Sequence, residues 1–413
     1  MPISNPWFLA ALIGIVGWFH VKLLAELLNL SRLTKDVPEP LRDLVTDEDQ
    51  ERTMEYHIAS TKLDVMHDAM MLAVFIAFWW LGGFQALDSW TSSFGLGPIQ
   101  TGLMLISVLM VLQSLLNLPF AWWSTFKVEA AFGFNKTTLA TFIGDRVKGI
   151  LLGAMLGLPL LALVLWLFEQ VPYAALWAWV VVSLGGLIMS WLSPRLIAPL
   201  FLKFTPLEDA ALRRAIMVMA EKLQFPVGDI SIVDGSRRST KANAFFTGFG
   251  NTRRIALFDT LLTTQSEEGI VGVLAHEIGH AKLKHVPKQI AVGLAQSALM
   301  FGLLHFALQD ARLFSAFGVV HASPAIGMIL FSLVYGPWSH LLDAPLQGLT
   351  RKHEFEADRF AAQSTGSPLP LMEALKKLSK DHLSHLTPHP FYVKLHYSHP
   401  PLLERLKALA DGA

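Results

Sequence analysis

The chain has 413 residues, of which 53% are hydrophobic and only 16% are charged, a balance far more apolar than that of soluble proteins. Lysine plus arginine equal aspartate plus glutamate at 33 each, and no dense basic run occurs, which excludes nucleic acid as a partner. The absence of cysteine excludes disulfides and thiolate metal sites, so any metal must bind histidine and carboxylate.

Long apolar runs recur along the chain, and each is close to the ~20 helical residues that cross a hydrocarbon core of ~30 Å. They predict seven membrane spans, at residues 7–30, 66–87, 102–123, 149–168, 173–192, 290–308 and 325–342. The first span lacks the basic start and the small-residue cleavage site of a signal peptide, so we expect a retained helix.

Several ionisable residues lie inside these spans or at their ends, where charge in lipid is costly. They are His20, Lys22, Glu26, Asp64, His67, Asp68 and His305. Two interpretations fit: the residues line a water-filled chamber among the helices, or their side chains reach the membrane interface.

The loops differ in their lysine and arginine content, which sets the orientation of a membrane protein. Both residues are frequent after spans one, three, five and seven, whereas the loops after spans two and four have neither. The loop after span six has only Arg312. This alternation predicts an outside N-terminus and a cytoplasmic C-terminus.

Between spans five and six, residues 193–288 form a soluble insertion on the cytoplasmic side. Its first helix is indicated by the three-to-four spacing of Leu212, Ile216, Met219 and Leu223. Strand-like runs at 229–233, 243–249 and 254–258 then predict a small sheet. A capping box at 264–267 opens a further helix that we expect to continue until Pro287.

That last helix carries His276-Glu277-Ile278-Gly279-His280, an H-E-x-x-H pattern. Residues four apart share one helical face, so His276 and His280 can bind one ion while Glu277 reaches a water molecule on it. Zinc lowers the pKa of that water towards ~7, and the glutamate takes its proton during attack on a peptide carbonyl. The plainer interpretation is a chance motif with a buried histidine or a helix ion pair.

A catalytic zinc needs a third protein ligand and one open position. Glu354 is the candidate, on a helix expected at 346–366, and Asp358 lies one turn further on the same face, where it can orient a ligand histidine. Glu356 points to another face. The remaining histidines near these motifs lack ligand spacing and are expected to be structural or solvated: His285, His353 and His396.

These residues resemble the type I CAAX prenyl proteases, membrane zinc endopeptidases that include the a-factor-converting enzyme. The resemblance covers nearly the whole chain, and seven spans match the family's arrangement. Besides the H-E-x-x-H helix it rests on the segments GFNKTT at 133–138, NAFFTG at 243–248, IALFDTL at 255–261, EFEAD at 354–358 and YSHP at 397–400. It implies one Zn²⁺ on His276, His280 and Glu354, with Glu277 as the base.

The resemblance further implies that Asn243, His399 and Arg405 contact the substrate backbone or the oxyanion of the tetrahedral intermediate. An amide, an imidazole and a guanidinium are suitable donors for that charge. Without the resemblance, Asn243 would be a turn residue and Arg405 a surface cation on the helix that Pro400 starts. The run 243–249 either presents an edge strand to an extended peptide or is buried sheet.

We therefore predict a mainly α integral membrane protein, in which a seven-helix transmembrane bundle carries a zincin-like α+β protease domain on the cytoplasmic side. The bundle encloses a chamber if its ionisable residues face inward. The divisions are spans one to five at 1–192, the insertion at 193–288, spans six and seven at 289–342, and a region completing the site at 343–413.

The predicted function is zinc-dependent hydrolysis of CAAX-type prenylated peptides or membrane-associated proteins, in the endoplasmic reticulum or a bacterial inner membrane. A transporter or channel would leave the H-E-x-x-H pattern unexplained. A non-catalytic scaffold would be expected to have lost a ligand or the base.

Overall fold

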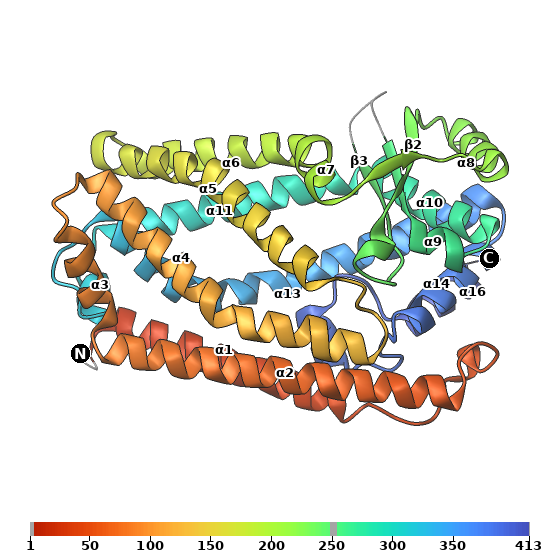
Figure 1. The fold of residues 1–413 in the computed structure, drawn as a ribbon, viewed down its shortest axis with the longest axis horizontal. Helices are drawn as coiled ribbons and strands as arrows, with labels where there is room; N and C mark the ends of the chain where they lie inside the picture. Colours follow the sequence, from red (N-terminus) through yellow and green to blue (C-terminus); the bar gives the residue numbers. More distant parts are fainter. Residues whose placement is uncertain (1–3, 248–253, 413) are drawn as a thin grey trace.

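The computed structural model describes residues 4–247 and 254–412. Within these residues, seven helices are long and apolar enough to cross a membrane, which matches the predicted number. They are α1 (Pro6–Leu30), α2 (Asp47–Trp80), α4 (Pro98–Trp123), α5 (Leu139–Gln170), α6 (Ala174–Leu192), α11 (His285–Leu308) and α13 (Pro324–Thr365). Figure 1 shows them running roughly along the long axis of the molecule.

Shorter helices and a small sheet complete the fold. Between the spans lie α3 (Gly83–Ser92), α7 (Ala198–Phe201) and α12 (Ala311–Ala316). The remaining helices are α8 (Ala210–Lys222), α9 (Asp259–Thr264), α10 (Glu267–Lys282), α14 (Leu369–Asp381), α15 (Pro390–His396) and α16 (Leu402–Asp411). In Figure 1 the sheet, α8, α10 and α14 gather at the end that holds the C-terminus.

The sheet has the strand order β1-β2-β4-β3 among the described residues. Its strands are β1 (Phe204–Pro206), β2 (Asp229–Val233), β3 (Ala244–Thr247) and β4 (Arg254–Phe258). The strands β2 and β4 are parallel, and β1 and β3 each pair antiparallel at an edge. The sequence pattern predicts β2 and β4 with their observed bounds. The short strand β1 is not predicted, and residues 248 and 249 of the expected third strand lie outside the described residues.

The second span ends earlier than predicted. α2 stops at Trp80 instead of continuing to residue 87, and α3 follows after a sharp turn. Gly82 takes the left-handed backbone conformation (φ 75°), and a β-carbon on Gly83 would overlap the ring of Phe78. Two glycines that permit a tight turn thus override the apolar continuation of the sequence.

The seventh span and the helix that carries Glu354 are one element. Two helices with a boundary near residue 343 were expected, but α13 continues without interruption for 42 residues. Pro337 and Pro345 lie inside it without ending it. The buried face of its second half, with Ala357 and Ala361 fully covered, packs into the protease core and extends the helix beyond the apolar run.

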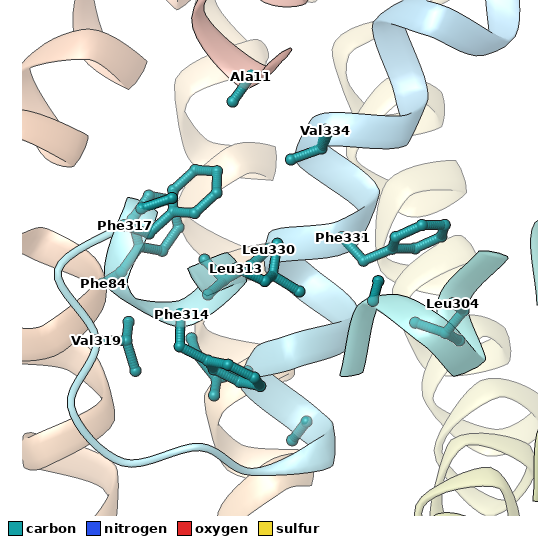
Figure 2. Packing of buried hydrophobic residues seen from close by; sticks show 14 of the residues in the cluster. Ala11, Phe84, Leu304, Leu313, Phe314, Phe317, Val319, Leu330, Phe331 and Val334 are labelled. Atoms are coloured by element: carbon teal, nitrogen blue, oxygen red, sulfur yellow. The ribbon is translucent and has the colours of Figure 1, made fainter. Parts of the chain in front are cut away.

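The bundle is closely packed at one end of the spans. Figure 2 shows Phe314 and Phe317 of the α12 segment packing against Phe84 and Leu330. The other buried members of this cluster come from the matching halves of the remaining spans, such as Phe8 at the start of α1. The buried share of the most apolar 18-residue window differs between spans, from 6% in the α4 span to 33% in α13. The large apolar cluster of the bundle thus lies at the end remote from the sheet.

Candidate metal centre and active site

The helix α10 carries the H-E-x-x-H residues, and its ends differ from the prediction. Its N-cap is Ser266, whose side chain accepts a hydrogen bond from the Gly269 amide, so the expected capping box at 264–267 is wrong. The helix stops at Lys282 instead of Pro287, because Lys284 takes a left-handed backbone (φ 58°). α11 begins directly after it.

Close packing of α10 on α13 brings the two halves of the motif together. A β-carbon on Gly279 would lie 3.2 Å from the Ala357 Cα and 3.1 Å from the ring of Phe360. The missing side chain at Gly279 therefore lets the two backbones approach. This contact places His276 and His280 beside Glu354.

Three ligand-type atoms surround one point between these helices. The Nε2 atoms of His276 and His280 are 3.1 Å apart. Glu354 places Oε2 3.5 Å from His276 Nε2 and Oε1 3.3 Å from His280 Nε2. His276 and Glu354 are both buried.

The donor set fits a metal cation. Two imidazole nitrogens face each other and a carboxylate across a short gap, and the buried Glu354 Oε2 has no well-aligned hydrogen-bond donor. Such a concentration of lone pairs is unfavourable unless a positive charge lies among them. Two histidines and one glutamate also form one of the usual protein ligand sets of a catalytic zinc, with a fourth position left open.

A buried ion pair supports the first histidine. Asp358 Oδ1 lies 2.8 Å from His276 Nδ1, on the side away from the other ligand atoms. Arg405 in turn donates to both Asp358 oxygens, with distances of 2.8 Å from Nε and 2.5 Å from Nη2. The structure thus places Arg405 in the interior and not at the surface.

The residues expected to meet the substrate line one cavity of about 630 Å³ together with the histidine helix. Asn243, Glu277, His399 and Arg405 all contribute to its wall, next to His276. His399 Nε2 lies 3.5 Å from Glu354 Oε2, while 63% of its side chain remains exposed. The structure therefore brings both soluble regions to one site.

The strand β3 forms an edge of the described sheet, directly after Asn243. Asn243 and Ala244 also line the cavity. Of the two interpretations of this run, the edge strand is confirmed for residues 244–247, and the buried sheet is not.

The surroundings shift the pKa values of the site. Burial raises the pKa of Glu277, which suits a group that accepts a proton near neutral pH. Burial alone would lower the pKa of His276, but the adjacent carboxylates of Asp358 and Glu354 outweigh it and raise the pKa to about 9. Partial desolvation lowers the pKa of His399 although 63% of its side chain is exposed, so the neutral imidazole predominates at pH 7.

One contact of the site is not predicted by the sequence pattern. His285 Nδ1 lies 3.1 Å from Nδ1 of His280, and its Nε2 lies 3.0 Å from Glu356 Oε2. Glu356 faces away from Glu354, as expected, and its carboxylate faces His285 instead. The only signal in the sequence is a histidine five residues after His280, and it becomes a contact only because the chain turns at Lys284.

The polar residues of the first two spans contact one another. Lys22 pairs with Asp68 at 2.6 Å, and the buried Glu26 accepts a hydrogen bond from Thr61 at 3.4 Å. His20 binds the carbonyl of Val16 on its own helix, whereas His67 Nε2 lies 2.8 Å from Asn117 Oδ1 of α4.

Comparisons with known proteins agree over both halves of the chain. A family model described as CAAX prenyl protease N-terminal, five membrane helices, matches residues 26–203, and the model of peptidase family M48 matches residues 206–413. The chain is 36% identical to the CAAX prenyl protease 1 homolog of Oryza sativa subsp. japonica, covering 91% of this chain and 90% of that protein. Its identity to CAAX prenyl protease 1 of Saccharomyces cerevisiae is 32%, over 90% and 88% of the two chains.

The fold agrees as well. The crystal structure of S. mikatae Ste24p superposes with a TM-score of 0.93 at 30% identity and covers 98% of this chain and 99% of that one. None of these matches favours a transporter, a channel or a non-catalytic scaffold. The chain therefore belongs to peptidase family M48 and is a membrane-embedded metalloprotease of the CAAX prenyl protease 1 family.

Proposed function

We propose that this protein is a zinc endopeptidase in which His276, His280 and Glu354 hold the metal and Glu277 is the general base. The observation that carries the proposal is the set of three facing ligand atoms, all within 4.8 Å of one another, on the wall that Glu277 shares. When bound there, zinc polarises the peptide carbonyl and lowers the pKa of water towards ~7.

The protein's own groups handle the proton and the ligands. Glu277, with its raised pKa, accepts the proton of the attacking water and passes it to the leaving amine. The Asp358 carboxylate lies 2.8 Å from His276 Nδ1, which favours a proton on that nitrogen and keeps the Nε2 lone pair available on the opposite side of the ring. Arg405 holds Asp358 in place through two hydrogen bonds, and it is the charge that balances this buried carboxylate.

Asn243 and His399 are the proposed substrate contacts. The neutral imidazole of His399 can donate a hydrogen bond to an oxygen that becomes negative during attack, and its exposure leaves it free to do so. Within the described residues β3 is an edge strand, and an extended peptide can align along its outer side. Asp358 uses Nε and one N–H of Nη2, so the second N–H of Nη2 and Nη1, which lies 3.9 Å from Glu354 Oε2, remain for the predicted oxyanion contact.

The proposed substrates are membrane-associated peptides and proteins, with C-terminally prenylated CAAX peptides as one class. Support comes from the relatives named CAAX prenyl protease 1, which match this chain over nearly their full length. We place the site on the cytoplasmic side, because the basic loops predict that orientation.

A metal and activity assay on paired variants tests the proposal. Glu277→Gln should abolish peptide cleavage and leave one zinc per chain, since it removes the base and no ligand. Glu354→Ala should lose the zinc as well. Elemental analysis and cleavage of prenylated and unprenylated versions of one peptide are the measurements. Full activity of Glu277→Gln, or native zinc content in Glu354→Ala, would refute the assigned roles.

A further inference from the structure

We infer that His285 and Glu356 are positioning residues that fix the orientation and the tautomer of His280. The inference deepens the proposed function, because it rests on His280 being a zinc ligand. Its basis is a continuous chain of contacts: Glu356 Oε2 lies 3.0 Å from His285 Nε2, and His285 Nδ1 lies 3.1 Å from His280 Nδ1.

The backbone turn between α10 and α11 places His285 in this series of contacts. The left-handed conformation of Lys284 (φ 58°) separates α10 from α11, so His285 is the first residue of a new helix and not a continuation of the old one. Its side chain is fully buried, and it stacks on His353 with ring centroids 4.0 Å apart. A left-handed non-glycine residue is costly, and it occurs here next to the site.

The contacts allow only one arrangement of protons when zinc is bound. His280 must present a lone pair at Nε2, so its proton sits on Nδ1 and is donated to His285 Nδ1. His285 therefore carries its own proton on Nε2 and donates it to the Glu356 carboxylate, which can only accept. The Glu356 carboxylate thus determines the tautomer of His285, and His285 in turn determines the tautomer of His280.

A second metal site made by the same residues is the competing explanation, since ligand atoms of His285, His353 and Glu356 lie within 4.8 Å of one another. The two imidazole planes are nearly parallel, however, at an angle of 10°. The lone pair of an imidazole nitrogen lies in the plane of its ring, so two stacked rings cannot direct their lone pairs at one ion. The geometry favours a hydrogen-bond chain.

Both ligand histidines then have an acidic partner outside the metal. His276 reaches Asp358 directly, and His280 reaches Glu356 through one intervening imidazole. Asp358 is buried and held by an arginine, whereas the Glu356 side chain is 35% exposed, with Lys352 Nζ at 3.8 Å. Outer partners of this kind are worth ~10–100-fold in metal affinity.

The test measures zinc release from the full-length protein into excess chelator. Glu356→Gln keeps the size of the side chain but can donate to His285 Nε2, so the tautomer is no longer imposed. We expect release to be faster by ~10-fold. The matched control is Asp343→Asn, which alters a carboxylate that also lies 3.0 Å from a histidine, His340, on the same helix. Its release rate should equal that of the native protein.

A pair of substitutions at position 285 separates positioning from packing. His285→Gln keeps one acceptor and one donor, whereas His285→Leu keeps only the bulk. We expect His285→Gln to retain zinc longer than His285→Leu, which a purely structural role would not produce. The visible absorption of the cobalt-substituted protein should change in Glu356→Gln and stay unchanged in Asp343→Asn.

The outcomes distinguish this inference from the proposed function. Native release from Glu356→Gln, together with zinc loss in Glu354→Ala, would overturn the chain of contacts and leave the metal site intact. Retention of zinc in Glu354→Ala would overturn the metal site itself.

Discussion

His276 is the residue at which the metal and protons compete most directly. Because its pKa is raised to about 9 in the metal-free protein, the imidazole carries a proton throughout the neutral range. Zinc must displace this proton, so we expect the zinc affinity to fall ~10-fold for each pH unit below about 9. Zinc-competition titrations at several pH values between about 6.5 and about 8.5 would measure this slope.

Asp358→Asn provides the control for that slope, because it removes the hydrogen-bonding carboxylate that raises the His276 pKa. The variant should bind zinc more weakly at pH 8.5 but with a shallower pH dependence. A zinc affinity that does not change with pH in the native protein would contradict the raised pKa.

For single residues, the sequence predicts those contacts that the geometry of one helix determines. The spacing of His276 and His280 places both on one face wherever the helix lies, and their Nε2 atoms are indeed adjacent. The contact of His285 with His280 could not be predicted, since it depends on a left-handed residue that no local pattern requires. The bidentate pair of Arg405 with Asp358 likewise joins residues 47 positions apart.

The proposed metal centre depends on the contact between the helices α10 and α13. Gly279→Ala would place a β-carbon 3.2 Å from the Ala357 Cα, so the helices must separate by a few tenths of an ångström. We expect a loss of stability of ~1–3 kcal/mol and faster zinc release. Thermal unfolding and the chelator assay are the measurements.

Gly302→Ala is the matched control, since it also lies within a long helix but has open space at the β-carbon position. It should leave zinc release unchanged. Equal effects of the two substitutions would show that helix propensity, and not the contact of α10 with α13, accounts for the loss.

Elements with a strong local pattern are predicted well, and those set by tertiary contacts are not. The apolar runs give all seven spans, and the alternating residues of β2 and β4 give both strands. The short strand β1 has only three residues and exists because β2 offers it a partner. The sequence pattern does not predict the continuity of α13 either, because contacts with the protease core stabilise its second half.

The orientation of the whole molecule can be tested cleanly because the chain contains no cysteine. Glu208→Cys introduces a thiol at an exposed position beside the sheet, and Ser92→Cys introduces one at the end of α3. With the protein expressed in a bacterial inner membrane, we expect an impermeant maleimide to label Ser92→Cys in intact cells and Glu208→Cys only after permeabilisation. The opposite pattern would place the proposed active site outside the cytoplasm.

The unbroken α13 has a consequence for the whole protein. A helix of 42 residues is ~63 Å long, about twice the ~30 Å hydrocarbon core, so one end is anchored in lipid while the other carries Glu354. A thinner or thicker bilayer changes the tilt of its anchored half through hydrophobic mismatch, and Pro337 and Pro345 lie where that tilt can be absorbed before it moves the ligand. The two prolines thus separate the geometry around Glu354 from the thickness of the surrounding bilayer.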